Sequence, residues 1–335
     1  MLVSIAIDPS CFGGNVVKDV ETKVAAEQIL AALGSNAVAL CALENEWVSE
    51  LVSEATKLNA TNTKLGQSLQ IRVEELLKLR RLSTVALNRR IKGSQLQRIR
   101  QISSLLRADI AVCANATEAV TLRGLVDETI EVCELRDYSN SDSEFKRAVW
   151  SEPQDLNNMD SMLAASIIGR SVKYAKKIEI VDPHIGKRAR DGRQTTQLKK
   201  TAEAILFVAE QWIDSSPYST NNGINITVIT KGGQVGAGGI IFPEKAGPAI
   251  ELALRDCDRK GLIGKSQVIF KKDSEPSKFR ARFIRAGQHC WSIGHEISDL
   301  RQLKKPPGQR GDFFIERDCK LFRKLVCDIY DLPNA

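Results

Sequence analysis

Short apolar runs alternate with longer amphipathic stretches over the first 135 residues of the chain. Four of these runs, at residues 2–8, 36–43, 108–115 and 128–135, are bounded by turn residues, which is typical of buried strands. Between them, apolar positions recur at helical spacing over residues 18–33 and 65–107, with a break near Gly93 and Ser94. Strands that alternate with helices predict a parallel α/β sheet.

The pattern restarts after a polar stretch at residues 136–160, which is rich in Ser, Asp and Asn and is typical of a linker. A helix over residues 161–175 and strands at 177–186, 224–230 and 266–273 follow, with helices over 195–213 and 246–259 between the strands. Residues 279–287 and 288–295 predict a β-hairpin, and residues 320–330 a closing helix. We therefore expect two α/β domains, 1–138 and 161–335, joined by a linker at 139–160. Each is expected to have a mainly parallel sheet flanked by helices.

Composition narrows the class of protein. With 335 residues, 43% hydrophobic and 27% charged, the chain can bury a sizeable core, so disordered and fibrous classes are excluded. The eight cysteines are scattered and form no CxxC pair, which argues against a zinc site. The chain opens on no cationic leader, and no stretch approaches the length of a membrane span. We therefore expect a cytoplasmic protein with no membrane association.

Positive charge is concentrated in one part of the sequence. The chain has 48 Lys and Arg against 41 Asp and Glu, a net charge of +7. Eleven of the basic residues lie between 61 and 108, where the only acids are Glu74 and Glu75. A basic face of this kind neutralises phosphates, so nucleic acid is an expected partner. The candidate nucleic-acid-binding residues are Arg80, Arg81, Arg89, Arg90, Arg98 and Arg100. A solvated helix face, or one that docks on an acidic protein, explains the same pattern.

Carboxylates follow the first two predicted strands. Asp8 ends the first strand just before Pro9, and Glu44 and Glu46 begin the helix after the second. Parallel sheets gather functional side chains at the carboxyl ends of their strands. Carboxylates there can hold Mg²⁺ or Mn²⁺, and such an ion can activate water. Asp8, Glu44 and Glu46 are therefore candidate catalytic residues, and Asp8, Glu46 and Asp109 are candidate metal ligands.

This arrangement resembles the opening of PIN-type nuclease domains over most of residues 1–138. The resemblance implies further acids at the ends of later strands, for which Asp109 and Asp127 are the candidates. A second interpretation stays open, in which Asp8 caps the turn before Pro9. In that case the two glutamates simply occupy a helix N-terminus, where negative charge is favoured.

A second group of candidates lies in the C-terminal half. The strand at 177–186 ends in Asp-Pro-His and leads into a basic loop that suits an anionic ligand. His184 and His295 follow strand-end turns, where an imidazole can serve as an acid or a base, although a loop histidine is commonly structural. The candidate phosphate-binding residues are Lys187, Arg188, Arg190, Arg193, Arg280 and Arg282.

The order of these elements resembles one lobe of the phospholipase D superfamily, especially the phospholipase D-like domains of bacterial conflict systems. Residues 182–185 and 291–300 carry the resemblance, which implies a phosphodiester ligand and lobes that act in pairs, hence a homodimer. Arg280 stands where the family has its nucleophilic histidine. Because a guanidinium is too basic to act as a nucleophile, no covalent phosphoryl intermediate can form there. Arg280 and Arg282 instead make a fork that can hold phosphate.

Two hypotheses follow. The first is a nucleic-acid-engaging component of a bacterial defence-type system, with a candidate Mg²⁺- or Mn²⁺-dependent nuclease in the N-terminal domain and a phosphate-binding C-terminal domain. The second is a non-catalytic assembly or regulatory subunit that binds an acidic partner protein or a phosphorylated ligand.

Overall fold

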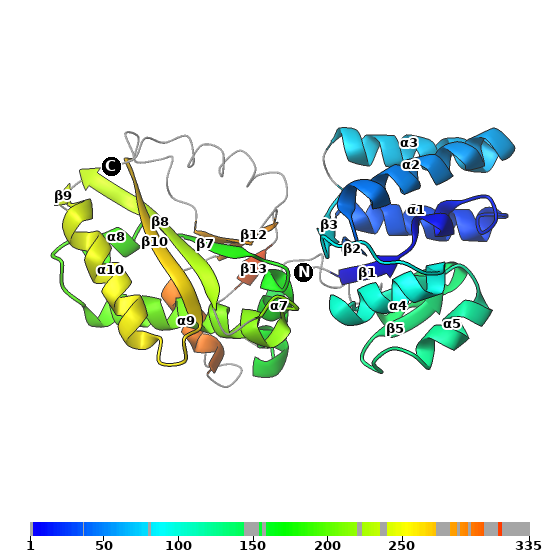
Figure 1. Cartoon of the computed structure of the whole chain (residues 1–335). Helices are drawn as coiled ribbons and strands as arrows, with labels where there is room; N and C mark the ends of the chain where they lie inside the picture. The colour runs from blue at the N-terminus through cyan, green and yellow to red at the C-terminus, as the bar shows by residue number, and fades with distance from the viewer. Residues whose placement is uncertain are drawn as a thin grey trace. The chain divides into compact units, whose positions relative to one another are not determined.

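The computed structural model divides into two compact units, Met1–Ser151 and Glu152–Ala335 (Figure 1). The structure describes residues 3–35, 37–79, 82–143, 154–155, 159–219, 223–234, 240–272, 282–286, 289–293, 296–304 and 314–316. The boundary between the units lies within the range 139–160 that the polar composition assigns to a linker. Arg80, Arg81, Arg280 and His295 and the expected helix over 320–330 lie outside the described residues.

The first unit is built on a five-stranded parallel sheet, in the order β3-β2-β1-β4-β5. Its strands are β1 (Val3–Ile7), β2 (Ala37–Cys41), β3 (Thr84–Ala86), β4 (Ile110–Cys113) and β5 (Glu131–Glu134). The parallel α/β sheet predicted from the sequence is confirmed. The expectation that 65–107 is only helical is wrong, because β3 lies inside that range. Three residues are too few to show the alternation of a strand.

Helices cover both faces of this sheet, with α1, α2 and α3 on one face and α4 and α5 on the other (Figure 1). They are α1 (Val20–Leu33), α2 (Glu44–Thr61), α3 (Thr63–Lys78), α4 (Gln95–Leu105) and α5 (Ala116–Arg123). Local sequence fixes several of their starts. Asp19 with Thr22 and Ser94 with Gln97 form capping boxes at α1 and α4, which satisfy backbone N–H groups that a first turn leaves unpaired.

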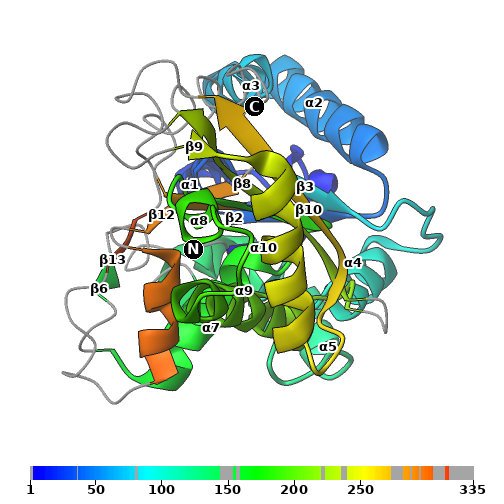
Figure 2. The same ribbon diagram turned by 90° about the vertical axis from the view of Figure 1, so that its left-hand side faces the viewer.

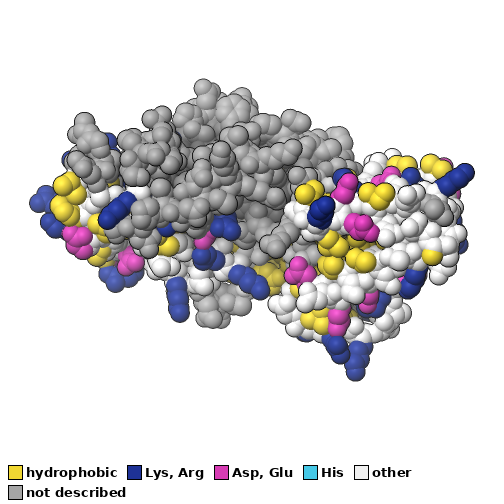
Figure 3. Space-filling view, turned by 90° about the horizontal axis from the view of Figure 1, so that it is seen from above, with side chains coloured by type: hydrophobic (Ala, Val, Ile, Leu, Met, Phe, Trp, Pro, Cys, Tyr) yellow, Lys and Arg dark blue, Asp and Glu magenta, His cyan; other side chains and the backbone are white. Residues whose placement is uncertain are grey.

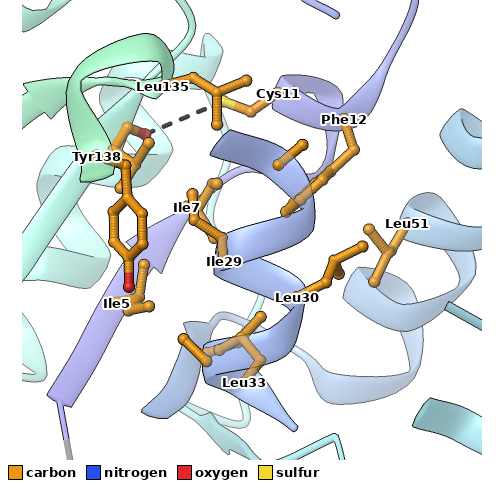
Figure 4. Packing of buried hydrophobic residues seen from close by; sticks show 14 of the residues in the cluster. Ile5, Ile7, Cys11, Phe12, Ile29, Leu30, Leu33, Leu51, Leu135 and Tyr138 are labelled. Carbon is orange, nitrogen blue, oxygen red and sulfur yellow. Dashed lines mark hydrogen bonds between the residues drawn. The ribbon is translucent and has the colours of Figure 1, made fainter. Parts of the chain in front are cut away.

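The core of the first unit lies between the sheet and α1. Figure 4 shows Ile29 of α1 close to Ile7 of β1, and Leu30 of α1 directed toward Leu51 of α2. Tyr138 belongs to a 3₁₀ helix (Leu135–Asn140) and is fully buried in the same cluster. The polar stretch that begins at residue 136 is therefore packed against the first unit at its start, and Ser141 is buried as well.

The second unit contains an eight-stranded mixed sheet in the part of the chain that the structure describes. Its main path runs β10-β8-β7-β11-β12-β13-β6, and β9 pairs with β8. The strands are β6 (Gln154–Asp155), β7 (Lys177–Val181), β8 (Ile224–Gln234), β9 (Ile240–Ile241), β10 (Ile263–Lys272), β11 (Phe283–Ala286), β12 (His289–Ile293) and β13 (Phe314–Glu316). β8 pairs in parallel with β7 and with β10, whereas β7 pairs antiparallel with β11 and β8 pairs antiparallel with β9. The predicted β11–β12 hairpin is confirmed, but the expectation of a mainly parallel sheet here is wrong, because the hairpin continues into β13 and β6 by antiparallel pairing.

Four helices and a 3₁₀ helix accompany this sheet among the described residues. They are α7 (Ser161–Val172), α8 (Ile185–Arg188), α9 (Thr196–Ser215), α10 (Pro243–Cys257) and the 3₁₀ helix Ile297–Lys304. The long helix α9 packs against α7, α10 and the 3₁₀ helix (Figure 2). Trp212 of α9 is buried and donates its indole N–H to the carbonyl of Ala175 at 2.8 Å, which fixes α9 against the chain that enters β7.

Candidate functional site

Asp8 lies at the carboxyl edge of the first sheet, directly after the central strand β1. From β1, the chain first adds β2 and β3 on one side of the sheet and then adds β4 and β5 on the other side. The strand order therefore reverses at β1. Ligands of open α/β sheets bind at such switch points, outside the carboxyl ends of the strands. Asp8 is only 5% exposed, and it lines a pocket of about 140 Å³ together with Glu46, Arg90 and Arg98.

Both carboxylate oxygens of Asp8 are already engaged. Oδ1 accepts hydrogen bonds from the backbone N–H of Ser10 at 3.2 Å and from its hydroxyl at 2.7 Å, so Asp8 does cap the turn that begins at Pro9. Oδ2 forms an ion pair with Nη2 of Arg98 at 2.7 Å. Arg98, expected to bind nucleic acid, therefore neutralises a carboxylate expected to bind metal.

The two glutamates of α2 differ in their surroundings. Glu46 lines the pocket, and its Oε1 lies 3.0 Å from Nη2 of Arg90. This is a second ion pair between a candidate metal ligand and a candidate nucleic-acid-binding residue. Glu44 is exposed and is not among the residues that line the pocket. Two residues apart on a helix point in different directions, so α2 brings only one of the two predicted glutamates toward Asp8.

Asp109 lies at the opposite end of the sheet. Its Oδ2 accepts hydrogen bonds from the backbone N–H of Ser4 at 2.8 Å and from its hydroxyl at 2.7 Å. Ser4 is near the start of β1, whereas Asp8 follows its end, a separation of about 13 Å along a strand. The structure therefore does not bring Asp109 to Asp8. Asp127 also stays apart, because its carboxylate caps a local turn at Thr129, whose hydrogen bonds lower its pKa.

The charges in this pocket do not form a ready metal site. Among the described residues, no group of three or more His, Cys, Asp or Glu side chains is close enough to hold a metal ion. Hard divalent cations require several oxygen ligands, but Arg98 and Arg90 already occupy oxygens of Asp8 and Glu46. The residues as arranged do not fit Mg²⁺ or Mn²⁺, and we derive no reaction step through either ion.

The described basic residues between 61 and 108 do not form one face. They lie on α3, in the loop 87–94, on α4 and just after α4, and α3 and α4 cover opposite faces of the sheet (Figure 1). Arg89 and Arg100 are exposed. On the face of the first unit seen in Figure 3, Lys and Arg side chains are separated from one another by uncharged and acidic surface. The predicted concentration of charge in the sequence is thus dispersed in space.

A second cluster of charged residues lies at the carboxyl end of β7 in the second unit. Asp182 follows β7 and is completely buried, and its Oδ1 accepts a hydrogen bond from the backbone N–H of His184 at 2.8 Å. The antiparallel register pairs Phe283 with Val181, which places Arg282 beside Asp182. Nε of Arg282 lies 3.7 Å from Oδ1 of Asp182, too far for a hydrogen bond. Within the described residues, Asp182 Oδ2 and Arg282 Nε are buried and have no hydrogen-bond partner.

Arg188, at the end of α8, is held from two sides. Its Nη1 donates to the hydroxyl of Thr201 at 2.6 Å, and its Nη2 forms an ion pair with Oε2 of Glu296 at 2.6 Å. Gln197 and Ser298 donate to the same Glu296 oxygen. Burial opposes ionisation of Glu296, but the charge of Arg188 and these hydrogen bonds outweigh it and hold the pKa of Glu296 below its usual value. The carboxylate is therefore charged at neutral pH and fixes the guanidinium.

His184 lies within the electrostatic reach of the whole cluster. Its pKa is lowered, mainly because burial disfavours the charged imidazole. Asp182 and Glu296 act to raise this pKa, and Arg282 and Arg188 act to lower it. The imidazole is accordingly neutral at pH 7, with one N–H to donate and one nitrogen to accept.

The structure thus brings together three of the residues predicted for the second unit, His184, Arg188 and Arg282. The other basic residues of the loop, Lys187, Arg190 and Arg193, are exposed, and Arg190 lies 3.5 Å from its neighbour Asp191. Sequence reasoning missed Asp182 and Glu296 as members of the cluster. The strand-end position that singled out Asp8 could also have identified Asp182, but nothing local to Glu296 indicates its contact with Arg188.

Comparisons with known proteins add no family to this geometry. No protein-family model, no curated protein and no solved structure matches the chain. Among the helices that the structure describes, none combines the length and apolar character needed to cross a membrane.

Proposed function

We propose that this chain binds phosphodiesters, and nucleic acid in particular, through the second unit, with one phosphate held by Arg188, Arg282 and His184. The observation that carries the proposal is the convergence of two guanidinium groups and a neutral imidazole at the carboxyl end of β7. Arginine binds phosphate through a planar fork of donors, which gives both charge and geometry.

The surroundings of each arginine support this role. The Arg188 side chain is only 9% exposed and is held by Thr201 and Glu296, so little conformational entropy remains to be lost when a ligand binds. Arg282 is 23% exposed and its buried Nε lacks a hydrogen-bond partner among the described residues. An unsatisfied buried donor of this kind favours a ligand that supplies an acceptor oxygen.

The proposal covers binding and not cleavage. In the first unit, Asp8 and Glu46 are paired with Arg98 and Arg90, so metal-dependent cleavage would require both arginines to leave. The resemblance to phospholipase D-like domains motivates two further parts of the proposal. These are a second copy of the chain as a partner, and a place in a bacterial defence-type system.

Fluorescence anisotropy with labelled single-stranded DNA, single-stranded RNA and duplex DNA of one sequence tests the proposal. We expect Arg282→Gln to weaken binding about tenfold and to reduce the slope of log affinity against log salt by about one phosphate contact. Lys200→Gln is the charge-matched control, because Lys200 is an exposed residue of α9, and we expect it to leave the affinity within about twofold. Equal effects of the two variants, or no binding of any nucleic acid at low salt, would overturn the proposal.

A second candidate function is a non-catalytic subunit that docks on an acidic protein. The ion pairs at Asp8 and Glu46 favour it, because both of these predicted catalytic acids at the switch point are paired with arginines. Competition separates the two candidates. Pyrophosphate should displace nucleic acid from a phosphate site at concentrations where polyglutamate of equal charge does not, whereas an acidic-protein site should respond to polyglutamate.

A further inference from the structure

The pocket beside Asp8 has an unusual balance of charge that the phosphate site of the second unit does not explain. Its lining includes three carboxylates, Asp8, Glu46 and Glu50, and three cations, Arg90, Lys92 and Arg98. Two carboxylates and two arginines are joined in the ion pairs described above. Glu50 and Lys92 are exposed, and neither has an ion-pair partner within the described part of the chain.

The two unpaired charges come from different walls of the pocket. Glu50 is four residues after Glu46 on α2, so both project from the same face of that helix. Lys92 belongs to the loop 87–94, which leads into α4 and contacts α2 through the ion pair of Arg90 with Glu46. A ligand in the pocket therefore meets an unpaired acid from α2 and an unpaired base from the loop 87–94.

Two further features define the ligand. Trp47 and Ile99 are buried residues of the lining and give the pocket an apolar floor. Nε of Arg98 is buried without a hydrogen-bond partner among the described residues, which leaves a donor for an acceptor oxygen on the positive side. The volume of about 140 Å³ is close to that of an engineered cavity that holds benzene, so the part of a ligand that lies inside the pocket has about six to ten non-hydrogen atoms.

These features exclude the simpler classes of ligand. An anion alone would face three carboxylates, and a cation alone would face three basic side chains. The loop after β1 lacks the GxGxxG spacing that cradles the pyrophosphate of a dinucleotide. A small molecule with one positive and one negative end satisfies both walls without displacing either ion pair.

We propose that this pocket binds a small zwitterion of the α-amino acid class. Glu50 receives the ammonium group, Lys92 and Arg98 Nε receive the carboxylate, and the side chain of the ligand rests on Trp47 and Ile99. The proposal is independent of phosphodiester binding by the second unit.

Thermal-shift measurements on the full chain with each common L-α-amino acid, followed by isothermal titration calorimetry of those that stabilise it, test the proposal. We expect at least one to bind with one-to-one stoichiometry. Its amide, which lacks the carboxylate, and its deaminated acid, which lacks the ammonium, should each bind at least about tenfold more weakly, because either leaves one wall unpaired. The proposal would be overturned if the chain bound no amino acid. It would also be overturned if the amino acid, its amide and its deaminated acid bound equally well.

Variants locate the site. Glu50→Gln and Lys92→Gln change exposed residues and should leave the fold intact, and we expect each to weaken amino acid binding about tenfold. Glu128→Gln and Lys78→Gln make the same changes of charge at exposed positions of the first unit outside the pocket, and should bind as the unchanged chain does. Binding that survives both pocket substitutions would overturn the assignment. Arg282→Gln should leave amino acid binding unaltered, so failure of one proposal does not imply failure of the other.

Discussion

The ion pair between Arg98 and Asp8 offers a direct test of the electrostatics at the carboxyl edge of the first sheet. Arg98→Met keeps a long side chain but removes the guanidinium that lies 2.7 Å from Oδ2 of Asp8. Asp8 is 5% exposed, so water can replace the lost donor only poorly. Oδ1 keeps its two hydrogen bonds from Ser10, so half of the carboxylate stays satisfied.

The structure bounds the size of the effect. Removing one partner of a fully buried pair costs about 3–5 kcal/mol, whereas exposed pairs contribute about 0–1 kcal/mol. Here one partner is buried and the other, Arg98, is 33% exposed, so the value should lie between these limits. We expect Arg98→Met to lower the free energy of unfolding of the first unit by about 2 kcal/mol.

Hydrogen exchange measured by mass spectrometry on the full chain can assign this loss to one unit. Peptides from β1 and α4 should exchange about thirtyfold faster in Arg98→Met under conditions where global opening controls exchange. Peptides from α9 belong to the other unit and should serve as an internal reference. Arg100→Met, an exposed change on the same helix, should stay within about 0.5 kcal/mol.

A double-mutant cycle gives the result that would refute this reasoning. In Asp8→Asn with Arg98→Met, the unpaired buried charge is gone, so part of the loss should return and the two changes should couple by about 1 kcal/mol. If the effects of the two substitutions simply add, the pair contributes nothing specific, and the interpretation of Arg98 as the counter-ion of Asp8 fails.

Three further predictions concern other parts of the molecule. Gly186→Ala should destabilise the second unit by about 2 kcal/mol, because an added Cβ would lie 2.5 Å from a backbone carbonyl of β8. It should also weaken nucleic-acid binding. Thermal unfolding measures the loss of stability, and fluorescence anisotropy measures the loss of binding. Iodoacetamide at pH 8 should alkylate the partly exposed Cys257 well before Cys41, because burial removes Cys41 from solvent and raises its pKa to about 12, as peptide mass spectrometry can follow. The pKa of His184, measured by NMR, should lie below its usual value of 6.5. It should be lower still in Asp182→Asn, because Asp182 is the charge that most favours the protonated imidazole.

The His184 shift also has a definite sign in stability. Since the folded pKa is lower than the unfolded one, the unfolded chain binds more protons between the two values. The contribution of His184 to stability is therefore complete above the unfolded pKa and is lost as pH falls toward the folded pKa. A flat dependence of stability on pH through this window in the unchanged chain, compared with His184→Gln, would contradict the assignment.

Each of the other two predictions has its own control. Gly124→Ala should be nearly neutral, since an added Cβ there meets its nearest neighbour at 3.7 Å. If it is as harmful as Gly186→Ala, steric contact with β8 is not the cause. Labelling of Cys41 as fast as Cys257 in the folded chain would show that β2 opens to solvent.

Much of the first unit followed from local patterns. Apolar runs located β1, β2, β4 and β5 because the residues of β1, β2 and β4 are buried on both faces of the sheet and the centre of β5 is buried as well. The same logic placed Asp8 at a strand end on the switch point. The strand β3 was not predicted, because its three residues are only half-buried and are too few to show an alternation of apolar and polar positions. In the second sheet the β11–β12 hairpin was predicted, but the antiparallel pairings with β13 and β6 were not, because pairing between distant strands leaves no mark within either strand.

Side-chain identity and spacing along the chain were enough to nominate Asp8, Glu46, His184, Arg188 and Arg282, since strand ends and turns are local features. Only the tertiary structure decided which acidic side chain forms an ion pair with which basic side chain. Asp8 and Arg98 are ninety positions apart, as the numbering shows, and Arg188 and Glu296 are separated still further. Electrostatic energy depends on distance through space and on exclusion of water. A basic residue that looks available to a polyanion in the sequence can therefore be the internal counter-ion of a buried acid in the folded chain.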